Sequence, residues 1–199
     1  MKPPWAYKVY SDKGKGRSAE NHYNTMTLDN IKNIKVNDIA EKDSVLILWV
    51  TSPCLPEGLE VLKSWGFKFK TVLFCWAKLN KHYKTNCETK EEFERQFRLN
   101  LGHHTRANIE LCLLGSKGKG IPRISKSIRQ LLIEPIEQHS KKPDVVKNKI
   151  ISLYGDLSKI ELFARCSTDG WTALGNEITG NDINVDIENL LSNQTNTNK

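Results

Sequence analysis

The run between residues 44 and 77 constrains the fold more than any other part of the chain. Residues 44–51 are apolar at nearly every position, which is typical of a strand covered on both faces in a parallel sheet. Pro56 then opens a predicted helix through Trp65, with Gly66 just past its end. Residues 67–77 are predicted as the next strand. A strand, a helix and a strand with short connections indicate an α/β sheet.

Four further elements follow from apolar periodicity and turn residues. They are strands at 109–114, 130–136 and 159–164, and an amphipathic helix at 143–154 that Gly155 closes. The stretch at 79–104 is polar and basic, with a short helix expected around 91–97. The polar run from about residue 181 onward is expected to be a loosely held tail. We therefore expect residues 1–180 to form one three-layer α/β domain and residues 181–199 a polar C-terminal tail.

Composition narrows the class of protein. The hydrophobic fraction of 38% and the charged fraction of 27% fit a globular protein rather than a disordered or membrane protein. The longest apolar run, residues 45–50, is far shorter than the about 20 apolar residues that a bilayer span needs. No secretory signal is visible, so no membrane partner is expected. The formal charge of +7 favours a polyanionic partner, although a merely basic surface would give the same charge.

The five cysteines are far apart and include no Cys-x-x-Cys pair, so neither a zinc site nor a disulfide framework is indicated. His103 and His104 have no second ligand pair at a useful spacing, and no metal site is predicted. Cys75 and Cys112 fall inside apolar strands, where reduced buried thiols are common. These features favour a reducing, cytoplasmic location.

Short motifs follow one another in a definite order along the chain. Pro3-Pro4-Trp5 comes first, and then a basic loop at 13–17 and His22-Tyr23. The later motifs are Gly102-His103-x-x-Arg106, Lys142-Pro143-Asp144, the strand at 160–165 and Leu174-Gly175-Asn176-Glu177. In this order they resemble the adenine methyltransferase family that contains the eukaryotic messenger-RNA adenosine methyltransferase and its bacterial and phage DNA-modifying relatives. The resemblance covers Pro3 to about Gly180.

The resemblance implies a three-layer Rossmann-like methyltransferase fold with permuted motif order, in which the catalytic motif comes first and the cofactor strand near the end. It implies S-adenosyl-L-methionine as cofactor, with a lysine for the methionine carboxylate and an Asn-Glu pair for the ribose hydroxyls. The remaining cofactor residues lie at the tip of the last strand, where open α/β sheets bind ligands. The cofactor residues implied are Lys142, Glu161, Phe163, Arg165, Asn176 and Glu177.

Each of these residues also has an ordinary reading without the resemblance. Lys142 is then a solvated residue before a helix, Glu161 a charge at a strand edge, and Asn176 a turn former.

The catalytic motif has a physical logic. The adenine 6-amino nitrogen is a poor nucleophile because its lone pair is delocalised into the ring. A carboxylate and a backbone carbonyl that accept hydrogen bonds from its two protons favour the positive charge that develops on attack. In the family's Asp-Pro-Pro-Trp motif the Asp and the first Pro carbonyl are these acceptors, and the aromatic ring stacks on the extruded base. The match implies that Pro3, Pro4 and Trp5 are catalytic-site residues and that Tyr23 lines the pocket.

Lys2 stands where the family has the Asp. A lysine has only donors, and its charge opposes a second positive charge nearby. Losing one charge-assisted hydrogen bond costs about 1.5–3 kcal/mol, or about tenfold to a hundredfold in rate. The family also places a strand just before this motif, for which this chain has no residues. We therefore expect the first, central strand to be lacking, through a late start or a decayed gene, and the activity to be impaired.

Nucleic-acid contacts are predicted from basic residues interleaved with aromatic ones. The residues concerned are Lys13, Lys15, Arg17, Trp76, Lys78, His103 and Arg106. Trp76 and Lys78 close the second strand and are expected to flank the base pocket. Solvated flexible loops are the alternative for the basic segments. Glu110 is expected either to pair with Arg106 or to cap its strand.

Methylation of the 6-amino group of adenine in DNA is the leading functional hypothesis, since the compact chain lacks the long extensions of the eukaryotic RNA enzymes. The alternatives are a non-catalytic nucleic-acid-binding member of the family and an N-terminally truncated remnant. The expected partner is therefore DNA rather than RNA, and a homo- or hetero-dimer is a further hypothesis.

Overall fold

The computed structural model describes residues 1–6, 25–102, 104–138 and 141–197. Six of its elements begin and end within two residues of the predicted ranges: β1 (Ser44–Val50), α3 (Leu55–Ser64), β2 (Lys68–Leu79), β4 (Leu131–Pro135), α5 (Val145–Tyr154) and β5 (Ile160–Leu162). Strand β3 (Ile109–Lys117) runs further than predicted, and α4 (Lys90–Glu94) is shorter. The elements without a predicted counterpart are α1 (Leu28–Lys32), α2 (Val36–Ile39), η3 (Ser52–Cys54), β6 (Thr172–Leu174), α6 (Asn176–Thr179) and α7 (Ile183–Thr197).

The main sheet is mixed rather than parallel. Its strands lie in the order β1-β3-β2-β4, with β3 antiparallel to both neighbours and β2 parallel to β4. The expectation of a parallel sheet was therefore wrong for the pairs that involve β3. A long connection from β2 returns the chain antiparallel without a crossover helix, whereas parallel neighbours need a crossover. The continuous apolar sequence of β1 indicates only that both faces of this strand are covered. This holds whether the neighbouring strand is parallel or antiparallel.

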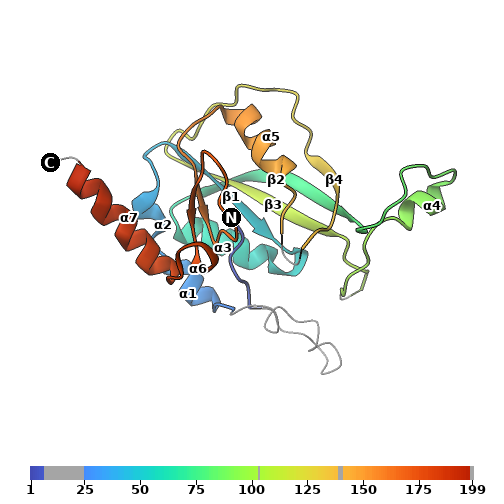
Figure 1. Cartoon of the computed structure of the whole chain (residues 1–199), viewed down its shortest axis with the longest axis horizontal. Coiled ribbons are helices and arrows are strands. Elements are labelled where there is room, and N and C mark those ends of the chain that lie inside the picture. Colours follow the sequence, from blue (N-terminus) through green and yellow to red (C-terminus); the bar gives the residue numbers. More distant parts are fainter. Residues whose placement is uncertain (7–24, 103, 139–140, 198–199) are drawn as a thin grey trace.

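Helices cover both faces of this sheet (Figure 1). Leu46, Leu48 and Val50 of β1 pack with Val61 and Leu62 of α3 in one core cluster. The intervening β1 residue Trp49 belongs to a second cluster, with Phe74, Trp76 and Val146 of α5. Because successive strand residues point to opposite faces, the two clusters lie on the two sides of the sheet. The molecule thus has three layers, with α3 and α5 outermost. Among the described residues, no helix is long and apolar enough to cross a membrane.

The first residues lie along the edge of β1 that β3 leaves free. The Met1 nitrogen donates to the Ile47 carbonyl at 3.1 Å, and the Trp49 nitrogen donates to the Met1 carbonyl at 3.0 Å. This is the hydrogen-bond pattern of parallel strands. Strands β5 and β6 form a separate, parallel two-stranded sheet, yet Leu162 and Leu174 of those strands share the α3-side core cluster with Trp5.

The C-terminal segment is a helix rather than a loose tail. Helix α7 brings Ile183, 4% exposed, and Ile187, 1% exposed, into the α3-side core, and α7 also contacts α2. Residues four apart share one helix face, so the two isoleucines dock the helix, and Leu190 and Leu191 extend the contact as partly buried residues. The prediction of a loosely held tail was wrong because the segment is polar overall, and the spacing of its apolar residues is a weak signal in such a sequence.

We expect Ile187→Ala to lower the free energy of unfolding by about 2–5 kcal/mol, because it removes a fully buried aliphatic side chain and leaves a cavity. The matched control is Val185→Ala on the same helix, whose side chain is 43% exposed and should cost no more than about 0.5 kcal/mol. Urea denaturation followed by circular dichroism measures both. Equal stability of the two variants would show that α7 does not contribute to the core.

Candidate cofactor and adenine site

A cavity of about 1060 Å³ opens between the first residues, the start of β1, α5 and the segment from β5 to α6. All six residues predicted to contact the cofactor line it: Lys142, Glu161, Phe163, Arg165, Asn176 and Glu177. Lys2, Pro3 and Pro4 of the catalytic motif line it too. The structure therefore brings together residues that are up to 175 positions apart in the chain, Lys2 and Glu177.

A buried carboxylate lies at one end of this site. Glu110 on β3 is 6% exposed, and its two oxygens face two ammonium groups: Oε1 lies 2.5 Å from Lys78 Nζ and Oε2 lies 2.6 Å from Lys142 Nζ. Lys142 Nζ also lies 5.6 Å from the ring centre of Trp49 and 5.5 Å from that of Trp76. The electron-rich ring faces attract the cation. Glu110 thus pairs with two lysines, and neither predicted alternative, an Arg106 pair or a simple strand cap, describes its contacts.

The charges of this cluster depend on one another. Burial alone would raise the pKa of Glu110, but Lys142, Lys78 and Lys2 outweigh it and lower the pKa to about 2. Burial lowers the pKa of Lys142 to about 8, against the opposing attraction of Glu110. Lys2 acts on both groups, so the residue in the Asp position of the motif belongs electrostatically to this cluster.

Lys142 lines the cavity, and its ammonium group has more donors than its contacts among the described residues use. Apart from the ion pair with Glu110, its buried Nζ has no hydrogen-bond partner within the described ranges. An ammonium group has three N–H donors. The chemistry of this position therefore suits an anionic group such as a carboxylate.

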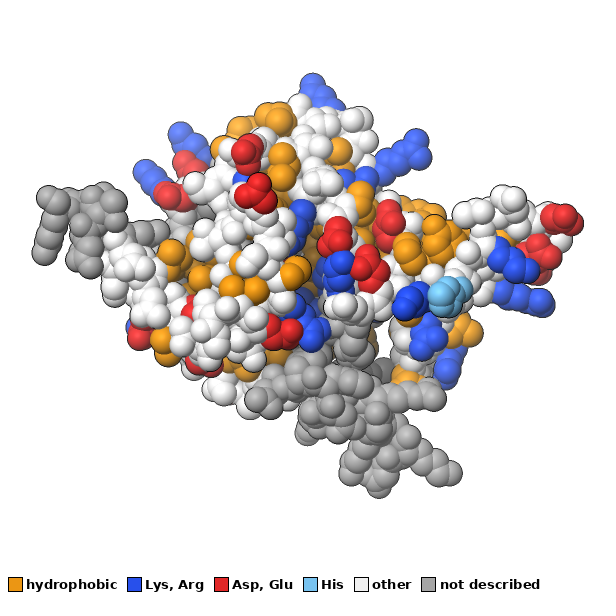
Figure 2. Space-filling model, viewed as in Figure 1, with side chains coloured by type: hydrophobic (Ala, Val, Ile, Leu, Met, Phe, Trp, Pro, Cys, Tyr) orange, Lys and Arg blue, Asp and Glu red, His pale blue; other side chains and the backbone are white. Residues whose placement is uncertain are grey.

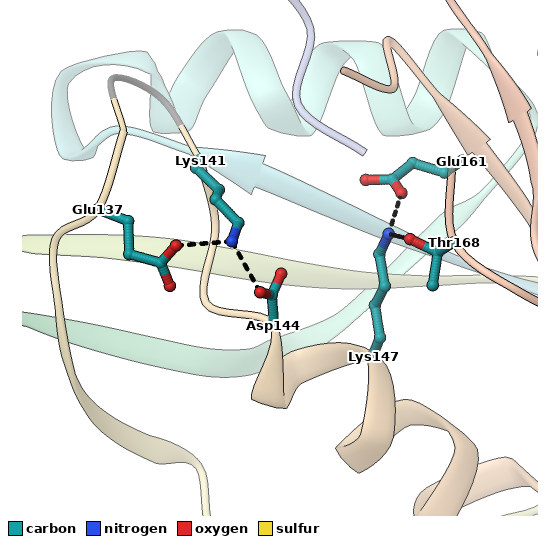
Figure 3. A network of polar contacts seen from close by, with 6 residues as sticks. All are labelled: Glu137, Lys141, Asp144, Lys147, Glu161 and Thr168. Carbon is teal, nitrogen blue, oxygen red and sulfur yellow. Dashed lines mark hydrogen bonds and ion pairs between the residues drawn. The ribbon is translucent and has the colours of Figure 1, made fainter. Parts of the chain in front are cut away.

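A second network lies along the wall formed by α5 and β5. Lys147 of α5 reaches Glu161 Oε2 at 2.6 Å and Thr168 Oγ1 at 2.5 Å (Figure 3). Lys147 was not predicted as a site residue; its position one turn after Pro143 on a cavity-facing helix was the available signal. The same figure shows Lys141 between Glu137, at 2.6 Å, and Asp144, at 2.7 Å. Glu161 thus faces the cavity as the partner of a fixed cation.

The chain turns sharply at the end of β5. Phe163 has a φ of 58° and is the one non-glycine residue with positive φ in the described part of the chain. Such a conformation costs about 1 kcal/mol or more and persists only where the surroundings impose it. Arg165, just beyond, bonds through Nε to Glu177 Oε1 at 2.7 Å. Two predicted cofactor residues are therefore paired with each other across the cavity rim.

The catalytic motif is held rigidly. Pro3 is buried, its carbonyl accepts the Trp5 N–H at 2.9 Å, and the Pro4 carbonyl accepts the Met26 N–H at 2.9 Å. A carbonyl oxygen has two lone pairs, and among the described residues the Trp5 N–H is the backbone donor that reaches the Pro3 oxygen. Trp5 is 5% exposed and donates its indole N–H to the Trp49 carbonyl at 3.2 Å. The predicted stacking of Trp5 on a base is not supported, because its ring is part of the core. Tyr23 lies outside the described residues.

The predicted nucleic-acid contacts divide into three groups. Trp76 is 3% exposed and donates its indole N–H to the Glu134 carbonyl at 2.9 Å, while Lys78 is held by Glu110. Both residues therefore lie inside the molecule beside Lys142, and their expected place at the base pocket stays a prediction. Alternation along β2 places these two residues on the α5 side of the sheet, which the local sequence did not reveal. Arg106 is exposed. Lys13, Lys15, Arg17 and His103 lie outside the described residues.

An arm formed by residues 80–108 connects β2 to β3 and projects from the body (Figure 1). Its base is tied by backbone hydrogen bonds from Asn80 to Gln96 at 2.8 Å and from Arg98 to Lys78 at 2.7 Å. Figure 2 shows Lys, Arg and His side chains gathered on this arm, with acidic side chains toward its end. The exposed basic residues are Lys81, Lys84, Lys90, Arg95, Arg98 and Arg106. Within the described ranges, no His, Cys, Asp and Glu side chains form a group that could hold a metal ion.

We expect Glu110→Gln to lower the free energy of unfolding at pH 7 by about 3–5 kcal/mol, because it leaves buried lysines without their counter-charge. The folded-state pKa of about 2 lies below the ordinary 4.5. The ionised Glu110 therefore stabilises the fold above about pH 4.5, and this contribution is lost as the pH falls toward 2. The stability gap between wild type and variant should shrink over that interval.

Urea denaturation from pH 3 to pH 7 measures this gap. The exposed Glu91→Gln on α4 is the matched control, with an expected change within about 0.5 kcal/mol at every pH. A pH-independent gap would contradict the assignment.

Comparison with known proteins places these features in a family. The family model described as MT-A70 matches residues 1–177. Type II methyltransferase M.MunI of Mycoplasma sp is 33% identical, over 92% of this chain and 78% of that protein. An MT-A70-like N(6)-adenosine-methyltransferase of Arabidopsis thaliana is 28% identical over 89% of this chain and 23% of that protein, and the catalytic subunit METTL3 of the Homo sapiens enzyme is 27% identical over 89% and 27%. The chain thus spans about a quarter of the length of these two adenosine methyltransferases. With its motifs gathered around one cavity and a family match over most of its length, the chain belongs to the MT-A70 methyltransferase family.

Proposed function

We propose that this protein transfers a methyl group from S-adenosyl-L-methionine to the 6-amino nitrogen of adenine in DNA. The observation that carries the proposal is the shared cavity, which joins Pro3 and Pro4 to the six residues of the predicted cofactor site. The motif at 3–5 precedes the β5 strand that carries the cofactor residues, which supports a permuted Rossmann-like arrangement of the family fold.

The cavity suits the cofactor at both ends. Lys142, whose buried Nζ has no hydrogen-bond partner in the described chain apart from the ion pair with Glu110, would hold the methionine carboxylate. Asn176 and Glu177 would hold the ribose hydroxyls, with Glu161, Phe163 and Arg165 completing the wall. When bound, S-adenosylmethionine supplies an electrophilic methyl group. The paired Lys147–Glu161 and Arg165–Glu177 contacts fix the wall in place.

The chain's own residues prepare the adenine amine. The second lone pair of the Pro3 carbonyl would accept one amine proton, and the buried ring of Pro3 holds that carbonyl in position. The second acceptor of the family, a carboxylate at position 2, is replaced by Lys2. A cation there disfavours the positive charge that develops on the amine. The activity of the natural sequence is therefore low.

DNA is the proposed substrate because the similarity to the type II methyltransferase M.MunI extends over 78% of that protein. The chain spans only about a quarter of the two adenosine methyltransferases. The exposed basic residues of the arm, with Arg106 at its base, would neutralise backbone phosphates. A cytoplasmic location and a homo- or hetero-dimeric assembly belong to the same proposal; the human relative is named as a catalytic subunit.

A second candidate function is a nucleic-acid-binding family member without catalysis. The observation that favours it is Lys2. Its positive charge acts on Glu110 together with those of Lys78 and Lys142, so the adenine end of the cavity is more positive than it would be with the family's Asp at position 2. A pseudoenzyme of this kind binds DNA with the same affinity whether or not S-adenosylmethionine is present. Calorimetric titration of DNA with and without the cofactor separates the two functions.

We expect Lys2→Asp to raise methyl incorporation into DNA adenine by about tenfold to a hundredfold, because it restores a charge-assisted acceptor for the amine. The assay uses labelled S-adenosylmethionine and unmethylated DNA. Lys2→Asn, which has the same shape as the Asp variant but no charge, is the matched control and should gain far less. Absence of label in adenine with Lys2→Asp would refute the proposed reaction.

A further inference from the structure

We propose that Asp186, on α7, is a positioning residue that holds the turn carrying Asn176 and Glu177 in the shape needed to bind the cofactor ribose. This inference rests on the proposed function, since it concerns the same cavity. Asp186 lies beyond residues 1–177, which the family match covers.

Asp186 gathers three donors from one short segment. Its Oδ2 accepts the backbone N–H of Gly175 at 2.9 Å and the Thr179 hydroxyl at 2.8 Å, and its Oδ1 accepts the Asn181 amide at 3.2 Å. These donors stand immediately before, within and after the part of the chain that contains Asn176 and Glu177. One side chain therefore spans the whole turn.

Among the described residues, the buried Asp186 carboxylate has hydrogen-bond donors but no cationic partner. Asp186 is 3% exposed, and no lysine or arginine of the described chain forms an ion pair with it. Burying such a charge is costly unless hydrogen bonds compensate it. An apolar residue at this place on α7 would leave the Gly175 N–H and the Thr179 hydroxyl without this acceptor. A charge retained here points to the geometry that its three hydrogen bonds impose.

The turn itself allows little alternative packing. Gly175 has a φ of 153°, and a Cβ at this position would lie 2.9 Å from the Ala164 carbonyl oxygen and 3.0 Å from the Ala164 nitrogen. The Ala164 nitrogen donates to the Leu174 carbonyl at 2.9 Å. The chain just before Asn176 is thus pressed against the chain just after Phe163. Asp186 fixes this close approach from the other side.

Helix α7 supplies a firm base for the contact. Ile183 and Ile187, which flank Asp186 in sequence, are 4% and 1% exposed in the core. The carboxylate is therefore anchored by packing and is not free to follow a displaced turn. α6 has only four residues, so its own hydrogen bonds are too few to fix its position.

The test compares Asp186→Asn with Glu188→Gln, which makes the same carboxylate-to-amide change at an exposed position of the same helix. In Asp186→Asn, the amide NH2 group is itself a donor and would face the donors that Asp186 now accepts from Gly175, Thr179 and Asn181. In the cofactor-free protein, we expect the backbone amides of residues 175–181 to exchange with deuterium about tenfold faster. The dissociation constant for S-adenosylmethionine, measured by calorimetry, should rise about tenfold, while DNA affinity stays within about twofold. Glu188→Gln should match the wild type in all three.

Thr179→Val keeps the carboxylate and removes one of its donors, so it answers the question if Asp186→Asn does not fold. It should show the same changes at about threefold. Unchanged cofactor affinity in a folded variant overturns the inference, with or without faster exchange. If the wild type binds no S-adenosylmethionine, the proposed function is overturned instead. In that case the deuterium exchange of residues 175–181 still tests Asp186, and an exchange rate that is the same in the variant and the wild type rejects its role.

Discussion

The Glu110 carboxylate, buried between Lys78 and Lys142, joins three parts of the molecule that would otherwise be independent. Glu110 belongs to β3, Lys78 to β2, and Lys142 to the segment that leads into α5. The indole rings of Trp49 and Trp76 lie beside the Lys142 ammonium group and lie 6.3 Å apart in an edge-on arrangement. The charge on one sheet residue thus fixes the end of the cavity, the entrance to a helix and the tryptophan layer beneath them.

The same cluster changes the meaning of Lys2. In sequence, Lys2 is a motif residue of the wrong charge. In the structure its charge acts on Glu110 and Lys142. Lys2 thus stands in place of the acceptor for the amine and also acts on the group that would hold the methionine carboxylate. The consequences of position 2 therefore extend across the cavity.

Sequence reasoning located most elements because their signals are local. Pro56 and Gly66 bracket α3, and continuous apolarity marks β1. The pairing of β3 between β1 and β2 was beyond reach, because strand order depends on contacts between distant segments. Helix α7 was missed because a few apolar residues, Ile183 and Ile187 among them, give only a weak periodic signal in a segment that is polar overall.

The residues that line the site were predicted from the sequence, but the burial of its aromatic residues and the contacts that support it were not. Motif order was enough to name the six residues that line the cavity, Lys142 and Glu177 among them. Burial was not readable from the motifs, so Trp5 and Trp76, which look like base-stacking residues, belong to the core. Lys147 and Asp186 belong to no sequence motif. Their contacts, Lys147 with Glu161 and Asp186 with Gly175, form only in the folded chain.

Helix α7 also decides where this protein can be divided. The family match ends at residue 177, but the apolar layer around α3 continues through Ile183 and Ile187 to Leu190. A shortened chain that ended at the family boundary would expose part of that layer to water and invite self-association. For protein production and for comparison among relatives, the functional unit extends through α7.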